Sequence, residues 1–168
     1  MQLHSLELLP DEAGRAAVLR DWQALRDAGL RSQLDHRGMT NTPHLTLVAA
    51  PVITEATERV AVEALAALLP VTVRTSGLLL LGARKLTVAR VVDVDDVLVA
   101  AVLRIRAAVE APQHPGWLPH LTLARRLPRS EAQQAVEVLG HDDLELTLTQ
   151  LRRWDPDLGS VRRVGVQV

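Results

Sequence analysis

The spacing of apolar residues along the chain predicts four helices and seven strands. Helices are predicted where apolar residues recur every three to four positions and the run ends at glycine or proline. Strands are predicted where short runs are rich in leucine and β-branched residues. The strands cover about 2–9, 43–50, 71–81, 85–92, 119–126, 144–152 and 161–167, and the helices about 11–28, 54–69, 94–111 and 129–139. This order of elements is typical of a mixed α+β fold.

One pentapeptide occurs twice in the chain. Pro43-His44-Leu45-Thr46-Leu47 and Pro119-His120-Leu121-Thr122-Leu123 are identical and lie 76 positions apart, nearly half the chain. Each copy is followed by a predicted helix and two predicted strands. The repeat therefore predicts two similar lobes, related by an approximate two-fold axis, with the helices outside. No linker rich in glycine, proline or serine separates the lobes, so we expect residues 1–168 to form a single domain.

The repeated segment places two polar side chains on one face of each strand. Because alternate side chains of a strand point the same way, His44 and Thr46 share a face while the leucines between and after them take the other. The same holds for His120 and Thr122. A two-fold relation between the lobes would bring both pairs together across a central groove, where two imidazoles and two hydroxyls meet one ligand.

Two histidines and two threonines are suited to acid–base chemistry at a phosphodiester. Imidazole titrates near neutral pH, so one ring can accept a proton from the attacking water while the other donates one to the leaving oxygen. Threonine hydroxyls can bind the non-bridging phosphate oxygens. This chemistry needs no metal or cofactor, and we expect none. A duplication kept only for packing is the alternative, but packing gives no reason to retain outward-facing polar residues in both copies.

Composition narrows the classes of partner. The chain of 168 residues has 19 basic and 20 acidic residues, a net charge of −1, which argues against bulk attraction to nucleic acid. The absence of cysteine excludes thiolate nucleophiles, disulfides and cysteine-ligated metals. No apolar run approaches the roughly 18–20 residues that cross a bilayer, and the N-terminus resembles no signal peptide. We expect a cytoplasmic monomer with no membrane contact and no obligatory protein partner.

His44-Leu45-Thr46-Leu47 and His120-Leu121-Thr122-Leu123 resemble the paired signatures of the two-histidine (2H) phosphoesterase superfamily. The stretch Pro119–Arg125 is similar to the second motif of its 2′-5′ RNA ligase / RNA 2′,3′-cyclic phosphodiesterase branch. The resemblance implies a LigT-like bilobal α+β fold, with antiparallel sheets lining a central cleft. It also implies metal-independent hydrolysis of 2′,3′-cyclic phosphates on RNA ends or small nucleotides, with reversible 2′-5′ ligation in some members.

The resemblance also implies roles for the four motif residues. His44 is expected to donate a proton to the leaving ribose oxygen, and His120 is expected to activate water. Thr46 and Thr122 are expected to hold the phosphate. Two alternatives remain open at this point: a non-catalytic module that binds a nucleotide or an RNA end, and an esterase for a non-RNA cyclic phosphate such as one made from ADP-ribose.

Further residues are candidates for binding the nucleotide or RNA-end substrate. Arg125 occupies the family-like position, and Arg126 shares the face of His120 by a period of two, so either can meet phosphate. The alternative is a solvated pair of arginines at the end of a strand. His4 alternates on the first strand and is a candidate for lining the cleft, the alternative being a histidine without function.

Aromatic residues for stacking a base are scarce, because the chain has no Phe or Tyr and only three Trp. Trp117, three residues before His120, is the aromatic placed to contact a nucleobase. The alternative for this side chain is packing at the start of a strand. Trp22 lies on a helical apolar stripe and is predicted to be in the core, and the sequence leaves Trp154 unassigned.

Overall fold

The computed structural model describes residues 2–36, 38 and 40–165. Its strands are β1 His4–Pro10, β2 Leu45–Ala50, β3 Val71–Leu81, β4 Lys85–Asp93, β5 His120–Pro128, β6 Glu145–Asp155 and β7 Ser160–Arg163. Its α-helices are α1 Glu12–Asp27, α2 Glu55–Leu65, α3 Asp96–Ala107 and α4 Ala132–Leu139, and two short 3₁₀ turns cover Gln33–Asp35 and Arg129–Glu131. The order of strands and helices confirms the mixed α+β prediction.

Helix starts follow local chemistry, and the ends of α1 and α4 lie within one residue of the predicted limits, whereas α2 and α3 end earlier than predicted. Asp11, Thr54 and Asp95 each accept a hydrogen bond from a backbone N–H of the first turn, which caps α1, α2 and α3. α2 ends at Leu65, whereas the sequence predicts its end at 69. The chain turns tightly directly after Leu65, and Leu68 N donates to Leu65 O at 3.0 Å. α3 stops at Ala107 rather than at 111. None of the described helices is long and apolar enough to cross a membrane.

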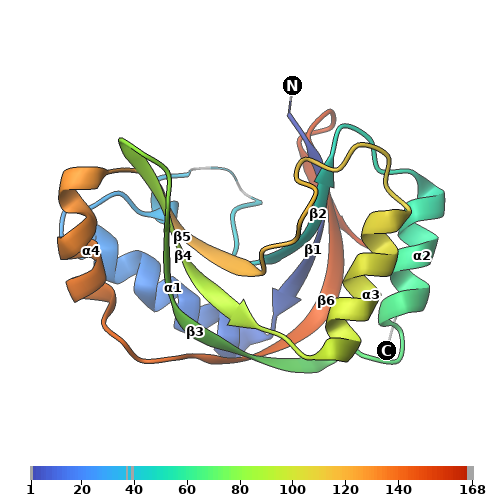
Figure 1. Cartoon of the computed structure of the whole chain (residues 1–168), viewed down its shortest axis with the longest axis horizontal. Helices are drawn as coiled ribbons and strands as arrows, with labels where there is room; N and C mark the ends of the chain where they lie inside the picture. The colour runs from blue at the N-terminus through green and yellow to red at the C-terminus, as the bar shows by residue number, and fades with distance from the viewer. Residues whose placement is uncertain (1, 37, 39, 166–168) are drawn as a thin grey trace.

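The strands form one continuous antiparallel sheet in the order β2-β1-β6-β3-β4-β5, and β7 pairs with the end of β6. The strands that carry the repeated pentapeptide, β2 and β5, are therefore the two edges of this order. The sheet is strongly curved (Figure 1), and β2 and β5 contact each other. We call β2-β1-β6 the first half and β5-β4-β3 the second half, and each half presents one motif strand.

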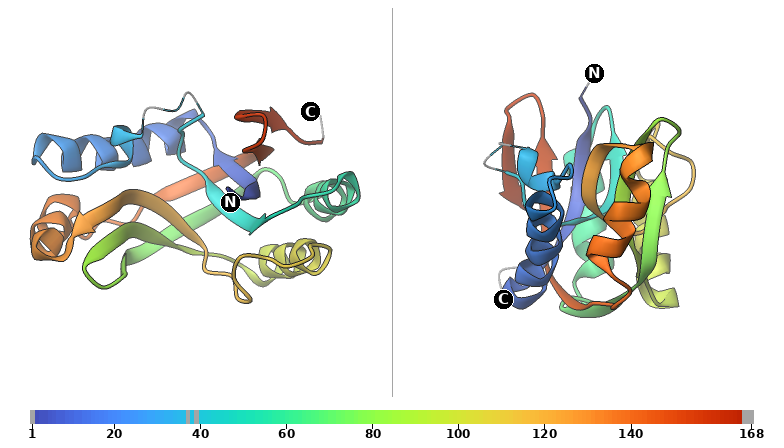
Figure 2. Two further views of the ribbon diagram at one scale, coloured as in Figure 1. Left: turned by 90° about the horizontal axis from the view of Figure 1, so that it is seen from above. Right: turned by 90° about the vertical axis from the view of Figure 1, so that its left-hand side faces the viewer.

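The helices flank the two ends of the curved sheet, with α1 and α4 at one end and α2 and α3 at the other (Figure 2). Two of them contact the half that their preceding strand does not belong to, and α1 also contacts β1 and β6 of its own half. α1 follows β1, yet Asp21 on α1 pairs with Arg90 on β4 at 2.6 Å. α3 follows β4, yet Arg106 on α3 donates to Leu47 O on β2 at 3.1 Å. These contacts tie the two halves together.

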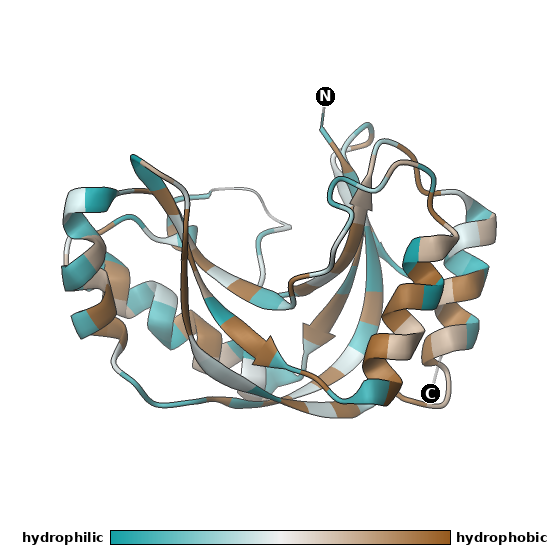
Figure 3. Ribbon diagram, viewed as in Figure 1, coloured by the Kyte–Doolittle hydropathy of each residue, from teal (hydrophilic) through white to brown (hydrophobic). Residues whose placement is uncertain are grey.

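The core consists of leucine, valine, isoleucine and alanine with Trp22. Apolar and polar positions alternate along the curved strands (Figure 3), and the apolar ones form the buried layer. The four motif leucines are at most 1 % exposed, which confirms that they take the buried face: Leu45, Leu47, Leu121 and Leu123. Trp22 is buried as predicted from its helical stripe. Burial of these leucines fixes which face of each motif strand remains for polar residues.

Candidate active site

The first motif presents His44 and Thr46 as partly exposed side chains at the start of β2. Nδ1 of His44 lies 2.7 Å from Thr42 O. A carbonyl oxygen only accepts hydrogen bonds, so Nδ1 must carry the proton in this contact. Nε2 is then the nitrogen that can accept a proton in the neutral ring and donate one in the charged ring.

The second motif has the same local geometry. His120 begins β5, and its Nδ1 lies 2.7 Å from Leu118 O, again the carbonyl two residues earlier. Thr122 is partly exposed, as Thr46 is. Both copies therefore hold the ring by the same short contact and leave Nε2 for chemistry.

The equivalence extends to a bulge directly after each threonine. The pairs across the bulge are Thr46 with Glu7 and Val48 with Leu6 in the first half, and Thr122 with Ala89 and Ala124 with Val88 in the second. Leu47 and Leu123 are thus the extra residues, and each is buried together with its successor. A bulge at the same place in both copies re-aims the strand after the threonine, so the two motifs match in structure as well as in sequence.

Tryptophan indoles bind the main chain of both motif threonines. Trp22 Nε1 donates to Thr122 O at 3.0 Å, and Trp117 Nε1 donates to Thr46 O at 2.9 Å. These bonds satisfy carbonyl groups of strands at the sheet edges, where ladder partners are lacking on one side. Trp117 precedes β5 and bonds to β2, so it links the two motif strands, and its ring also packs against the core.

A buried carboxylate lies beside the first histidine. Glu7 is 5 % exposed, and its Oε1 lies 3.7 Å from His44 Nε2. Ser5 Oγ donates to the same oxygen at 2.6 Å, and Arg152 Nε donates to Oε2 at 2.7 Å. Arg152 also donates to Thr40 O at 3.2 Å, and its Nη2 lies 3.5 Å from His44 Nδ1.

Glu7 is held in its charged form. Burial by itself would raise the pKa of Glu7, but the charges of His44 and Arg152 and the hydrogen bonds from Ser5 and Arg152 outweigh it, so the pKa lies below its usual range. Neither Glu7 nor Arg152 is among the residues predicted from the sequence to form the site. The available signal was a single carboxylate between Leu6 and Leu8 in an otherwise apolar strand, because a buried charge requires partners.

The two arginines after the second motif are both exposed. Register shifts lie on either side of Val88 in the β4–β5 pairing, and Arg126 has a positive φ of 59°. A count by twos from His120 therefore does not determine the face of Arg126. Arg125 and Arg126 occupy the stretch between the residues paired with Val88 and Leu86, and no ion pair joins either of them to another described residue.

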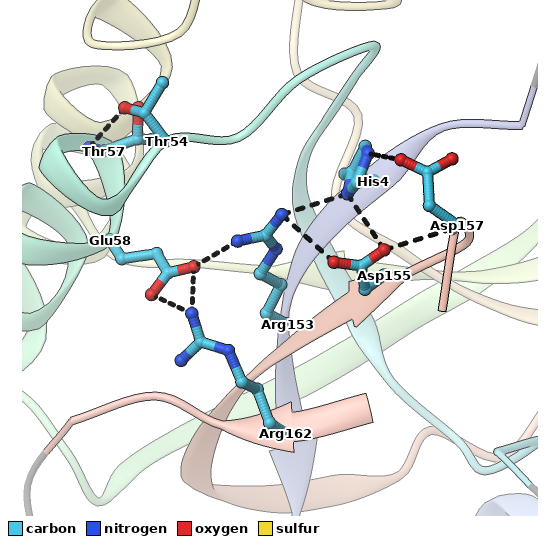
Figure 4. Close-up of polar contacts among 8 residues, drawn as sticks. All are labelled: His4, Thr54, Thr57, Glu58, Arg153, Asp155, Asp157 and Arg162. Carbon is cyan, nitrogen blue, oxygen red and sulfur yellow. Dashed lines mark hydrogen bonds and ion pairs between the residues drawn. The ribbon is translucent and has the colours of Figure 1, made fainter. Parts of the chain in front are cut away.

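The structure does not bring His4 together with the motif histidines. His4 is 6 % exposed and, by alternation along β1, lies on the face opposite Glu7. Its Nδ1 lies 3.1 Å from Arg153 Nη2, and its Nε2 lies 3.3 Å from Asp157 Oδ2 (Figure 4). His4 is thus part of a charge cluster near the turn between β6 and β7.

This cluster contains a group of possible metal ligands. Ligand atoms of His4, Asp155 and Asp157 all lie within 4.8 Å of one another. Arg153 Nη2, however, lies 3.1 Å from His4 Nδ1 and 3.4 Å from Asp155 Oδ2, so a positive charge already contacts two members of the group. Arg153 also donates to Glu58 on α2 at 2.8 Å (Figure 4). The group is therefore better suited to joining α2 to the sheet than to binding a metal.

Two cavities lie away from the motifs. One of about 460 Å³ is lined by residues of β3, Arg90 and the end of α4, and one of about 620 Å³ by residues of α2 and Arg162. Neither is lined by a motif histidine or threonine, so we assign neither to the candidate site.

A family model described as the 2′-5′ RNA ligase superfamily matches residues 10–159, a range that contains both motifs. The chain belongs to this superfamily. No curated protein matches the chain. Membership agrees with the 2H phosphoesterase resemblance carried by the two pentapeptides, and it covers nearly the whole sequence.

Solved structures show the same fold at low sequence identity. The MHV ns2 PDE domain is 14% identical with a TM-score of 0.57, covering 98% of this chain and 100% of that one. TT0787 of Thermus thermophilus is 20% identical with a TM-score of 0.56, covering 90% and 86%. E. coli LigT in its apo form is 13% identical with a TM-score of 0.54, covering 99% and 95%. The LigT-like α+β fold predicted from the sequence is thereby confirmed.

Proposed function

We propose that this member of the 2′-5′ RNA ligase superfamily hydrolyses 2′,3′-cyclic phosphates, on RNA ends or small nucleotides, by acid–base catalysis with His44 and His120. The observation that carries the proposal is the matched state of the two rings, each with Nδ1 bound to a carbonyl and Nε2 left for proton transfer. Superfamily membership supports a phosphodiesterase, and one structural neighbour is itself named as a PDE domain.

The proposed reaction divides two proton transfers between the rings. His120 Nε2 takes a proton from water, whose oxygen forms a bond to phosphorus while the bond from phosphorus to one ribose oxygen breaks. His44 Nε2 gives a proton to that leaving oxygen, and the product is a phosphomonoester. The hydroxyls of Thr46 and Thr122 donate to the non-bridging oxygens, where negative charge develops. A 5′-hydroxyl in place of water would give a 2′-5′ diester by the same two proton transfers, and cleavage of that diester back to the cyclic phosphate would exchange the two proton roles.

Substrate contacts outside the motifs are assigned to exposed residues. Arg125 and Arg126 are exposed on the strand of His120 and are proposed to bind phosphate. Trp154 pairs with Ser5, lies on the same strand face as Arg152 and is partly exposed. Because the ring of Trp117 packs against the core and its Nε1 is bound to Thr46 O, we favour Trp154 as the ring that stacks a base. Replacing Trp154 with Leu should raise KM for a nucleoside cyclic phosphate more than for ribose cyclic phosphate.

The direct test is hydrolysis of a nucleoside 2′,3′-cyclic phosphate in the presence of EDTA. His44→Ala and His120→Ala should each lower kcat by about 10²–10⁴-fold. His141→Ala is the matched control, since this exposed loop histidine belongs to no motif. Activity that EDTA abolishes, or that survives both motif substitutions, would reject the proposal. Tight binding of a nucleoside monophosphate without turnover would replace it with a non-catalytic binding module.

A further inference from the structure

The two halves of the site differ at one structurally equivalent position. The residue paired with the motif threonine is Glu7 in the first half and Ala89 in the second. The two positions are equivalent, because each lies next to the bulge that follows the threonine. On the next strand, Arg152 is paired with Glu7, whereas Leu79 is paired with Ala89. These two equivalent positions are therefore charged in the half that carries His44 and apolar in the half that carries His120.

Glu7 is built into the structure as a fixed negative charge. It is 5 % exposed, and hydrogen bonds from Ser5 and Arg152 occupy its two oxygens. These partners and the neighbouring ring hold its pKa below the usual range despite the opposing effect of burial. The carboxylate is therefore ionised throughout the pH range in which imidazole titrates.

Among the described residues, the charged groups in ion-pair or hydrogen-bond range of the His44 ring are Glu7 from β1 and Arg152 from β6. Nδ1 already donates its proton to Thr42 O at 2.7 Å, so Arg152 acts on the ring through its charge, which favours the neutral imidazole. Glu7 favours the charged imidazole. Its distance of 3.7 Å from Nε2 is longer than a hydrogen bond, so Nε2 stays available to substrate.

Resting on the proposed function, we propose that Glu7 is a positioning residue whose buried carboxylate offsets Arg152 and keeps a proton on His44, so that the first half supplies the general acid. The second half has Ala89 in the equivalent place and supplies the base. The contact that carries this assignment is the 3.7 Å approach of Glu7 Oε1 to His44 Nε2, which has no counterpart at Ala89.

The first test follows the ring protons of His44 by NMR as pH is varied, and it needs no substrate. Glu7→Gln leaves Arg152 unopposed, so the titration midpoint of His44 should fall by about one pH unit or more. Glu7→Gln combined with Arg152→Gln removes both charges, and the midpoint should return to within about 0.3 units of the unsubstituted protein. A purely structural role would not give this return.

Glu58→Gln is the matched control. Like Glu7→Gln, this substitution removes a buried carboxylate that accepts hydrogen bonds from arginine, here Arg153 and Arg162. Glu58, however, lies on α2 and has no contact with His44. The titration of His44 should be unchanged in this variant. If Glu7→Gln also leaves the His44 midpoint unchanged, or if the double variant shifts it as far as the single one, the inference is overturned. The double variant is also the safer one to fold, because it leaves no unpaired buried charge.

The second test is the pH dependence of kcat/KM for a nucleoside 2′,3′-cyclic phosphate. The descending limb reports the general acid, so Glu7→Gln should move that limb to lower pH by about one unit and leave the ascending limb in place. A shift of the ascending limb instead would give Glu7 to the base and overturn the assignment. A protein that hydrolyses no cyclic phosphate would reject the proposed function, while the NMR titration would still decide whether Glu7 controls His44.

Discussion

The two halves of the sheet share their backbone and differ in their charges. Both carry a histidine whose Nδ1 meets the carbonyl two residues earlier, a threonine followed by a bulge, and a tryptophan indole on the threonine carbonyl. Only the first half places a carboxylate and an arginine beside its histidine, among the residues that the structure describes. The repeated backbone places two histidines in matching positions, and the neighbouring side chains give the two rings different electrostatic surroundings.

The largest expected effect is on kcat, when the variants of the two histidines are compared on a substrate whose leaving group needs no general acid. Both His44→Ala and His120→Ala should lose about 10²–10⁴-fold in kcat on a ribose cyclic phosphate. On a p-nitrophenyl phosphodiester, whose leaving group departs without a proton, His44→Ala should recover most of its activity and His120→Ala should not. Rates on the two substrates check this. Equal recovery in both variants would remove the proposed difference between the halves.

The tryptophan contacts allow a smaller effect to be compared between the halves. Trp22→Phe and Trp117→Phe each leave a threonine carbonyl without its donor. Trp22 is 2 % exposed, so Thr122 O stays dry, and we expect a loss of about 1–3 kcal/mol in unfolding free energy. Trp117 is only partly buried, so water can replace its indole and the loss should be smaller. Urea unfolding of the two variants measures both values; a larger loss for Trp117→Phe would contradict this reasoning.

The smallest effect should be a difference in acid stability that originates in the first half. The pKa of Glu7 is lower in the folded chain than in the unfolded chain. Its contribution to stability is therefore complete above its unfolded pKa and is lost as pH falls through the folded pKa. Glu7→Gln should flatten the decline of unfolding free energy below about pH 4, the ordinary range of a glutamate. Denaturation series between pH 7 and pH 2 test this. An unchanged slope would show that Glu7 is not charged in the fold.

Much of the candidate site follows from local sequence. The identical pentapeptides mark two strands, and alternation correctly predicts burial of Leu45 and Leu121 on the face opposite the polar side chains. Helix starts at Asp11 and Asp95 are also local, because an N-cap needs only its own first turn. The ends of α2 and α3 were predicted too far along the chain, since a proline marks a limit that a helix need not reach.

Tertiary structure alone decides which strands are neighbours in the sheet and which charged side chains come into contact. The bulge after Thr46 and the contacts of α1 and α3 with the opposite half depend on pairings that no short segment contains. Glu7 reaches Arg152 across 145 positions of the chain, and Trp22 reaches Thr122 across 100. Periodicity reports only which face of a segment is apolar. The chain itself therefore determined two equivalent histidines, and long-range packing decided that one of them has a buried carboxylate as its neighbour.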